Sequence, residues 1–132
     1  QSYLSLKYGL QKKSIDNPAT AGQDERDYFN SAGNVVWDYS NNTGYLNDIA
    51  GIGRDDKSVL DQQKSKSTNA NSSLSLDKGA AFPNDNDYIV WGSNGLTGYN
   101  TNTPSGYEFI TSRNWKTTVT GTPGMVNLTV DL

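Results

Sequence analysis

The sequence predicts an all-β fold, an antiparallel β-sandwich of jelly-roll type preceded by one short helix. Two observations carry this prediction. First, Asn, Ser, Thr and Gly supply 54 of the 132 residues, and Asp outnumbers Glu by 12 to two. Short polar side chains compete with helical hydrogen bonds and favour turns. Second, about seven short apolar segments lie between the polar stretches, and most of them alternate apolar and polar residues as half-buried strands do.

The first ten residues fit two patterns. Alternate leucines have the period of a strand, whereas Leu4, Lys7 and Tyr8 fall on one helical stripe that ends at Gly9. We predict a short helix here, because a glycine that follows a helical stripe is a common C-cap. Residues 11–34 then form a polar connection.

The expected strands are residues 35–39, 45–52, 59–63, 70–76, 88–91, 115–119 and 126–132. The fifth is a continuous apolar run, which is typical of a strand buried on both faces. Residues 92–106 form a loop rich in Gly, Asn and Thr. The last two segments alternate on either side of Gly121–Gly124, which predicts an amphipathic β-hairpin. Because that alternation stops at Leu132, we expect the domain to be incomplete at its C-terminus.

Missing residue types exclude whole classes of function. The chain has neither Cys nor His, so it holds no zinc finger, thiolate nucleophile or Ser-His-Asp triad. A net charge of −3 without a basic stretch argues against nucleic acid as a partner, because phosphate binding depends on Lys and Arg. No apolar segment approaches the about 20 residues that cross a bilayer, so no membrane insertion is expected. No carboxylate pair is placed for glycoside hydrolysis, and we expect no enzyme.

Oxygen-bearing side chains gather before the strand at residues 88–91. They are Asn84, Asp85, Asn86 and Asp87. Together with backbone carbonyls they could supply the about six to eight oxygens that Ca²⁺ prefers, so we expect calcium as a cofactor there. The loop lacks the Gly and Glu of an EF-hand, and an Asx-rich turn that starts a strand explains it equally well. A second, less specific oxygen cluster comprises Asp24, Glu25 and Asp27.

The segment Gly51–Asp56 compares with the glycine-rich fingerprint of dinucleotide-binding proteins. Its third glycine position holds Asp56, and no βαβ unit surrounds it, so the nucleotide interpretation fails. We interpret Arg54, Asp55 and Asp56 as structural residues. They would lie where a strand runs into a bend whose backbone is made flexible by its glycines. There Arg54 would pair with a carboxylate such as Asp48 or Asp55.

Aromatic residues are the remaining candidates for binding. Trp37, Trp91 and Trp115 lie inside strand patterns, so we expect them in the core. Tyr99 and Tyr107 flank the Gly/Asn/Thr loop, where a sandwich places recognition residues. We predict that these two tyrosines are exposed and bind a ligand, for example by stacking on a sugar.

Several segments along nearly the whole chain form one ordered pattern. They are Ser2–Gly9, Val36–Asp38, Tyr45–Asp56, Leu60, Gln62, Gln63, Ser65–Ser67, Val90–Gly92, Arg113–Lys116, Gly121, Gly124, Val126 and Val130. Together they resemble a domain of unknown function of bacterial extracellular proteins. That domain recurs in large surface proteins of Bacteroidetes and in repeats-in-toxin adhesins of Gammaproteobacteria, often after a laminin-G-like domain of concanavalin type.

The resemblance implies that residues 1–10 are a linker helix from a preceding domain and that residues 11–132 are the β-sandwich domain. An ending at Asp131 and Leu132 fits a split domain of such an adhesin. We therefore expect a non-catalytic extracellular module at the cell surface, with a structural or ligand-presenting role in adhesion. Its expected partners are neighbouring domains of the same polypeptide and a host or algal surface glycan or peptide. The alternative is a carbohydrate-binding module of a secreted polysaccharide-active enzyme.

Overall fold

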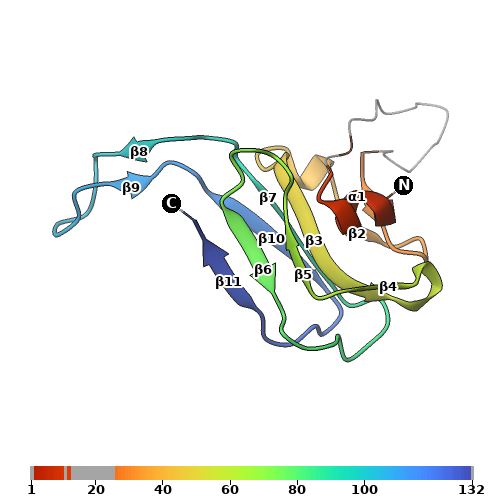
Figure 1. Cartoon of the computed structure of the whole chain (residues 1–132). Coiled ribbons are helices and arrows are strands. Elements are labelled where there is room, and N and C mark those ends of the chain that lie inside the picture. The colour runs from red at the N-terminus through yellow and green to blue at the C-terminus, as the bar shows by residue number, and fades with distance from the viewer. Residues whose placement is uncertain (1, 11, 13–25, 132) are drawn as a thin grey trace.

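The computed structural model describes residues 2–10, 12 and 26–131 and confirms an all-β fold with one short helix (Figure 1). All strand pairs are antiparallel. The elements are α1 (Ser2–Tyr8), β1 (Tyr28–Phe29), β2 (Val35–Trp37), η1 (Ser40–Asn42), β3 (Asn47–Asp55), η2 (Asp56–Ser58), β4 (Leu60–Gln62), β5 (Lys64–Lys66), β6 (Leu74–Asp77), β7 (Tyr88–Ser93), β8 (Tyr99–Asn100), β9 (Ile110–Thr111), β10 (Trp115–Thr120) and β11 (Asn127–Val130). None of the described helices is long and apolar enough to cross a membrane.

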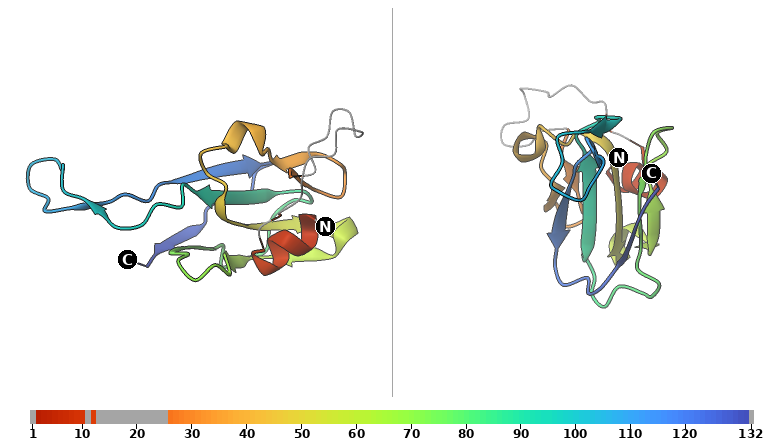
Figure 2. Two further views of the ribbon diagram at one scale, coloured as in Figure 1. Left: turned by 90° about the horizontal axis from the view of Figure 1, so that it is seen from above. Right: turned by 90° about the vertical axis from the view of Figure 1, so that its left-hand side faces the viewer.

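The strands form two main sheets in a sandwich-like arrangement (Figure 2). One sheet has the order β10-β7-β3-β4, and the other has the order β11-β6-β5. Helix α1 and the small β1–β2 sheet pack on the four-stranded sheet as well. The central strands β3 and β7 therefore have cover on both faces.

Strand β7 shows this double burial residue by residue. Tyr88 and Val90 lie in the apolar cluster shared with α1 and β2, whereas Ile89 and Trp91 lie in the cluster shared with β6. Successive strand side chains point to opposite faces, so an unbroken apolar run fills both. The prediction of a strand buried on both faces is confirmed, and all six residues of β7 are buried.

Two glycines of β3 make room for the first of these clusters. A Cβ atom on Gly51 would lie 2.9 Å from Leu6 Cδ2 of α1, and one on Gly53 would lie 2.4 Å from Tyr88 Cδ1. The glycine-rich segment therefore lies inside a continuous strand rather than in the bend expected from sequence. Its bare backbone is the surface on which the helix and a tyrosine ring pack.

The end of α1 follows the predicted C-cap. Gly9 has φ +60°, its N–H donates to Leu6 O, and the Leu10 N–H donates to Ser5 O. These two bonds form the Schellman pattern, which satisfies carbonyls that the helix itself leaves free. A helix that begins at Ser2 and ends at Tyr8 thus matches the sequence pattern.

The predicted hairpin at the end of the chain is wrong. Strand β10 pairs with β7, and β11 pairs with β6 in the other sheet. The connection of residues 121–126 crosses between the sheets, with Gly121 and Gly124 at positive φ. Val126 then packs on the cluster between the sheets, so an apolar strand face finds its cover across the sandwich instead of beside its neighbour in sequence.

Candidate ligand-binding site

A hairpin that we call the arm, residues 94–112 with β8 and β9, extends beyond the sandwich (Figure 1). Part of the predicted loop at residues 92–106 is thus strand, because β7 continues to Ser93 and β8 follows. The arm exposes five large apolar side chains: Leu96, Tyr99, Tyr107, Phe109 and Ile110. Such a concentration on one projecting element is typical of an interaction surface.

The aromatic residues of the arm are held by local contacts. The rings of Tyr99 and Phe109 are tilted against each other, with their centroids 4.6 Å apart. The Tyr107 N–H donates to Pro104 O, and the hydroxyl of Thr103 donates to Tyr107 O. Tyr107 therefore sits on a closed turn at the tip, and its side chain is 67% exposed. Tyr99 and Tyr107 are exposed as predicted.

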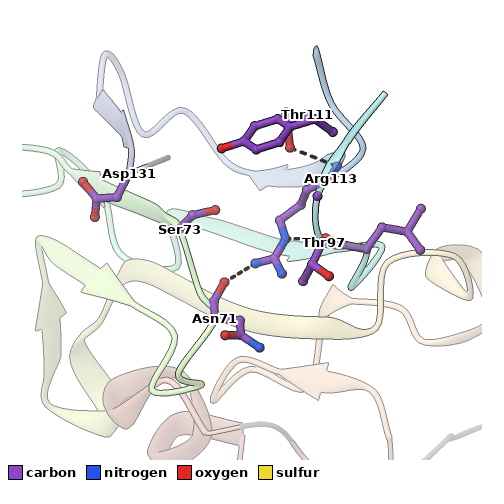
Figure 3. Close-up of a pocket in the computed structure, with 9 residues that line it drawn as sticks. Asn71, Ser73, Thr97, Thr111, Arg113 and Asp131 are labelled. Atoms are coloured by element: carbon purple, nitrogen blue, oxygen red, sulfur yellow. Dashed lines mark hydrogen bonds between the residues drawn. The ribbon is translucent and has the colours of Figure 1, made fainter. Parts of the chain in front are cut away.

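A cavity of about 220 Å³ opens at the base of the arm. Figure 3 shows side chains from three parts of the chain around it: the arm with Arg113 directly after it, the loop before β6, and Asp131 directly after β11. The residues that line it are Asn71, Ser73, Leu96, Thr97, Gly98, Tyr99, Thr111, Arg113 and Asp131. We call this cavity the arm pocket. Its lining combines one aromatic ring with hydroxyl, amide, carboxylate and guanidinium groups.

A buried ion pair anchors the pocket to the sandwich. Arg113 Nη1 lies 3.2 Å from Asp48 Oδ2, and both side chains are buried. The second carboxylate oxygen of Asp48 accepts from the amide of Asn69 at 3.0 Å, and Oδ2 also accepts from the Ser93 hydroxyl at 2.7 Å. Both oxygens of the buried Asp48 carboxylate therefore have hydrogen-bond partners, which offsets part of the free-energy cost of burying its charge.

Arg113 also holds the two loops that form the pocket walls. Its Nε donates to Leu96 O at 2.8 Å, and its Nη1 donates to Asn71 O. Nη2 has no hydrogen-bond partner among the described residues, although Arg113 lines the cavity. Asp131, at the other side of the pocket, pairs with Lys66 at 2.9 Å. The pocket therefore offers a donor and an acceptor to a small polar group.

With this geometry described, the comparisons with known proteins add one finding. The family model described as "Domain of unknown function (DUF8202)" matches residues 1–132. The chain belongs to this family. Neither the curated proteins nor the solved structures include a match.

One of the two tyrosines predicted to bind a ligand lines this pocket of the DUF8202 domain. Tyr99 lines it, whereas Tyr107 lies at the tip of the arm and is not among the lining residues. Sequence reasoning missed Arg113, Asn71 and Asp131. Nothing in the sequence indicated the role of Arg113, because its partner Asp48 lies 65 residues away in sequence.

The oxygen-rich loop of the DUF8202 domain forms a tight turn before β7. Asp87 Oδ1 accepts from the Thr122 N–H at 2.9 Å, and its Oδ2 accepts from the backbone and side-chain amides of Asn84, both at 3.1 Å. Asp85 Oδ1 accepts from the Asp56 N–H at 2.8 Å, and Asn86 adopts φ +63°. These contacts are those of the Asx-rich turn that was the alternative interpretation of this loop.

Both oxygens of Asp87 thus accept hydrogen bonds from the protein itself. In the described part of the chain, no three His, Cys, Asp or Glu side chains gather into a possible metal group. Asp24 and Glu25 lie outside the described residues. Asp27 is buried and accepts from the Tyr39 N–H at 2.6 Å. Calcium stays a prediction.

Arg54 forms its ion pair with Asp56 instead of with Asp48 or Asp55. Its Nε and Nη2 donate to the two carboxylate oxygens at 2.7 and 2.9 Å. Arg54 and Asp56 are two positions apart, where the chain leaves β3 for η2, so this bidentate contact closes the end of the strand. Asp48, as described above, belongs to Arg113.

Asp55 is the centre of a separate buried network. Its carboxylate accepts from the Ser31 N–H and hydroxyl at 2.7 and 2.5 Å, from the Tyr88 hydroxyl at 2.9 Å and from the Ser58 N–H at 3.1 Å. Burial alone would raise the pKa of Asp55, but these four hydrogen bonds outweigh it and hold the pKa below its usual value. Burial and the adjacent carboxylate raise the pKa of Tyr88. The network joins the turn after β1 to the end of β3.

Proposed function

We propose that this DUF8202 domain is a non-catalytic, extracellular module of a bacterial adhesin or surface protein, and that the arm presents its ligand-binding surface. The observation that carries the proposal is the placement of its aromatic residues. Tyr99, Tyr107 and Phe109 are each more than half exposed on one projecting hairpin, although aromatic side chains gain free energy from burial. A partner that covers them would recover that free energy.

The arm is also built to stay in place while it presents these rings. Asn94 donates its side-chain amide to Ser112 O at 3.1 Å and accepts from the Asn114 N–H at 3.1 Å. Together with the Arg113 contacts, these bonds fix both ends of the hairpin to the sandwich. A fixed hairpin loses little conformational entropy on binding.

A second candidate function is carbohydrate binding at the arm pocket. The specific observation is its lining, in which the Tyr99 ring is combined with side chains that donate and accept hydrogen bonds. Arg113 Nη2 can donate to a sugar hydroxyl, and Asp131 can accept from one. With about 220 Å³, the pocket suits one small polar unit rather than a drug-sized ligand, whose sites have about 300 to 1,000 Å³.

Binding by arm variants tests both candidates. The purified chain is applied to a glycan array and to bacterial, algal and host cells, together with Tyr99→Ala and Tyr107→Ala. Tyr8→Ala is the matched control, because Tyr8 lies on α1 and is 56% exposed, as is Tyr99. We expect the arm variants to lose cell binding at least tenfold and the control to keep it.

The outcomes separate the two functions. Binding to a defined sugar that is lost with Tyr99→Ala makes the chain a carbohydrate-binding module. If the arm variants lose cell binding but the parent chain binds no glycan on the array, the partner of the arm is something other than those glycans. If all variants bind equally well, the arm does not take part in binding and the proposal is wrong.

The calcium prediction is tested by measuring the thermal stability of the domain. We expect millimolar Ca²⁺ to raise the melting temperature above its value in excess chelator, because a ligand bound by the folded state alone stabilises that state. Asp85→Asn should abolish the difference if the loop at residues 84–87 is the site. An unchanged melting temperature in the parent chain would disprove the calcium prediction.

A further inference from the structure

Arg113 keeps one open hydrogen-bond donor at the arm pocket. Its Nε and Nη1 donate to Asp48, Leu96 O and Asn71 O, whereas no described residue accepts from Nη2. The side chain is only 6% exposed, yet Nη2 is not one of the fully enclosed unpaired atoms of the described residues. Figure 3 shows the guanidinium group between Thr97 and Asn71, in the wall of the cavity. A cationic N–H group is therefore held in one place and left open to a small molecule.

The sandwich holds this arginine at the expense of regular strand geometry. The pairing of β3 with β7 shifts its register between Asn47 and Ala50, and Asp48 within this irregularity has φ +56°. Positive φ is uncommon for a residue other than glycine, and a strand irregularity of this kind re-aims a side chain. Here it places the Asp48 carboxylate on Arg113.

The ion pair that results is not needed for packing. Apolar residues of similar volume often stabilise a protein as well as a buried ion pair does. What apolar residues do not supply is a guanidinium group in a fixed orientation at the wall of a cavity. The pair of Asp48 and Arg113 supplies this group, and all its contacts lie between residues 48 and 113.

The surroundings of Nη2 are polar side chains that are open as well. Asp131, the one acidic residue among the described residues that line the pocket, already pairs with Lys66. The open charged donor is thus a cation, and an aromatic ring, hydroxyl groups and an amide lie around it. The lining side chains whose polar groups have no hydrogen-bond partner among the described residues are Asn71, Ser73, Thr97 and Tyr99.

We propose that the arm pocket binds a uronic acid, a sugar whose C6 is a carboxylate, with this carboxylate on Arg113 Nη2. The inference rests on the proposed carbohydrate binding at this pocket and names the class of sugar. A hydrogen bond to an ionised group is roughly twice as strong as one between neutral groups, so the guanidinium favours a carboxylate oxygen over a hydroxyl. The Tyr99 ring covers one face of the sugar, and Asn71 and Thr97 pair with its hydroxyl groups. A peptide carboxylate would use the cation but leave these polar groups without partners.

The first test uses the parent chain and three ligands that differ only at C6. They are the methyl glycoside of galacturonic acid, the methyl ester of that acid, and methyl galactoside, together with the same three compounds in the glucose and mannose series. Titrations are followed by two-dimensional NMR of the backbone amides. We expect the acid of at least one series to bind at least about tenfold more tightly than its ester and its neutral sugar, because only the acid carries the charge.

The outcomes separate this inference from the proposed function. Equal binding of acid and ester would overturn the uronic acid and leave carbohydrate binding in place. If no compound of any series binds at about 10 mM, carbohydrate binding at the pocket and the inference are both wrong. If N-acetylaspartate amide binds as tightly as the acid sugar, the pocket recognises a carboxylate without a sugar, and the inference is wrong as well.

The second test locates the carboxylate on the parent chain. The Nε–H of Arg113 donates to Leu96 O, and the Nε–H of Arg54 donates to Asp56. Hydrogen bonding slows proton exchange, so that both groups give NMR signals. The acid sugar should shift the Arg113 signal and leave the Arg54 signal unchanged, because Arg54 does not line the pocket. An Arg113 signal that does not move at saturation would overturn the inference.

Paired variants complete the test. Asp48→Asn/Arg113→Met removes both charges of the buried pair and should abolish the preference for the acid over the ester. Arg54→Met/Asp56→Asn removes the ion pair at the end of β3 and is the matched control, which should keep the preference. Circular dichroism checks that both variants are folded, and where the first is not, the Arg113 signal of the parent chain decides. A preference for the acid that survives in the folded Asp48→Asn/Arg113→Met variant would contradict the assignment to Arg113.

Discussion

The sandwich and the arm use aromatic residues in opposite ways. In the sandwich, Trp37 and Trp91 are completely buried, and each packs in one of the two apolar clusters. In the arm, Tyr99 and Phe109 pack chiefly against each other and leave more than half of their surface exposed. We therefore expect substitutions in the sandwich to change stability, and the proposed function predicts that substitutions in the arm change binding.

The largest effect is expected at the centre of the sandwich. Trp91→Ala removes a fully buried side chain from β7, which is packed on both faces, and should lower the free energy of unfolding by about 4 kcal/mol. Urea unfolding measured by circular dichroism checks this value. A loss below about 1 kcal/mol would mean that the core is not packed as described.

Arg113 belongs to both regions, because it pairs with Asp48 of the sandwich and lines the arm pocket. Arg113→Ala leaves Asp48 buried without its cation and should lower the free energy of unfolding by about 3 kcal/mol. The same variant should also lose any ligand of the arm pocket. The double variant Asp48→Asn/Arg113→Met, which removes both charges, should recover part of the stability but not the binding.

The contribution of Asp55 to the stability of the sandwich depends on pH. Its pKa is lowered in the folded state, so its stabilisation is complete above the unfolded pKa of about 4 and is lost as the pH falls through the folded pKa. Asp55→Asn should cost about 2 kcal/mol at pH 7, and its difference from the parent should shrink in acid. Tyr88→Phe, which removes one of the four donors, should give a smaller effect of the same sign. A difference independent of pH would contradict the network.

The smallest effect on stability is expected at the tip of the arm. Tyr107→Ala should change the free energy of unfolding by less than about 0.5 kcal/mol, because an exposed side chain has little native contact to lose. The same urea measurement checks this. Only a much larger loss would show that the arm is part of the core.

Several elements of this fold were predictable because they carry a local signal, whereas the short strands β1, β5, β8 and β9 were not predicted. The unbroken apolar run at residues 88–91 gave β7, and Gly9 marked the end of α1. The pairing of β10 and β11 was not predictable, because an alternating strand shows which face is apolar and not what covers that face. Both a hairpin and a crossing between sheets satisfy the same alternation.

The candidate site shows the same limit. The exposure of Tyr99 and Tyr107 was predictable because both lie beside a surface loop rich in glycine and asparagine. Arg113 and Asp48 come from segments far apart in the chain, and no spacing in the sequence relates them. The prediction that Arg54 pairs with Asp48 or Asp55 was also wrong, because the chain leaves β3 for η2 and brings Asp56 to the guanidinium.

The double cover of β3 and β7 determines how the domain can open. Fraying of one layer, either α1 with the β1–β2 pair or the three-stranded sheet, leaves the other face of these strands packed. The backbone amides of β3 and β7 are therefore exposed to solvent only when the domain unfolds as a whole. We expect them to be the most slowly exchanging amides of the domain. The arm has no such layer above it, so amide exchange there is set by local opening while the rest of the domain remains folded.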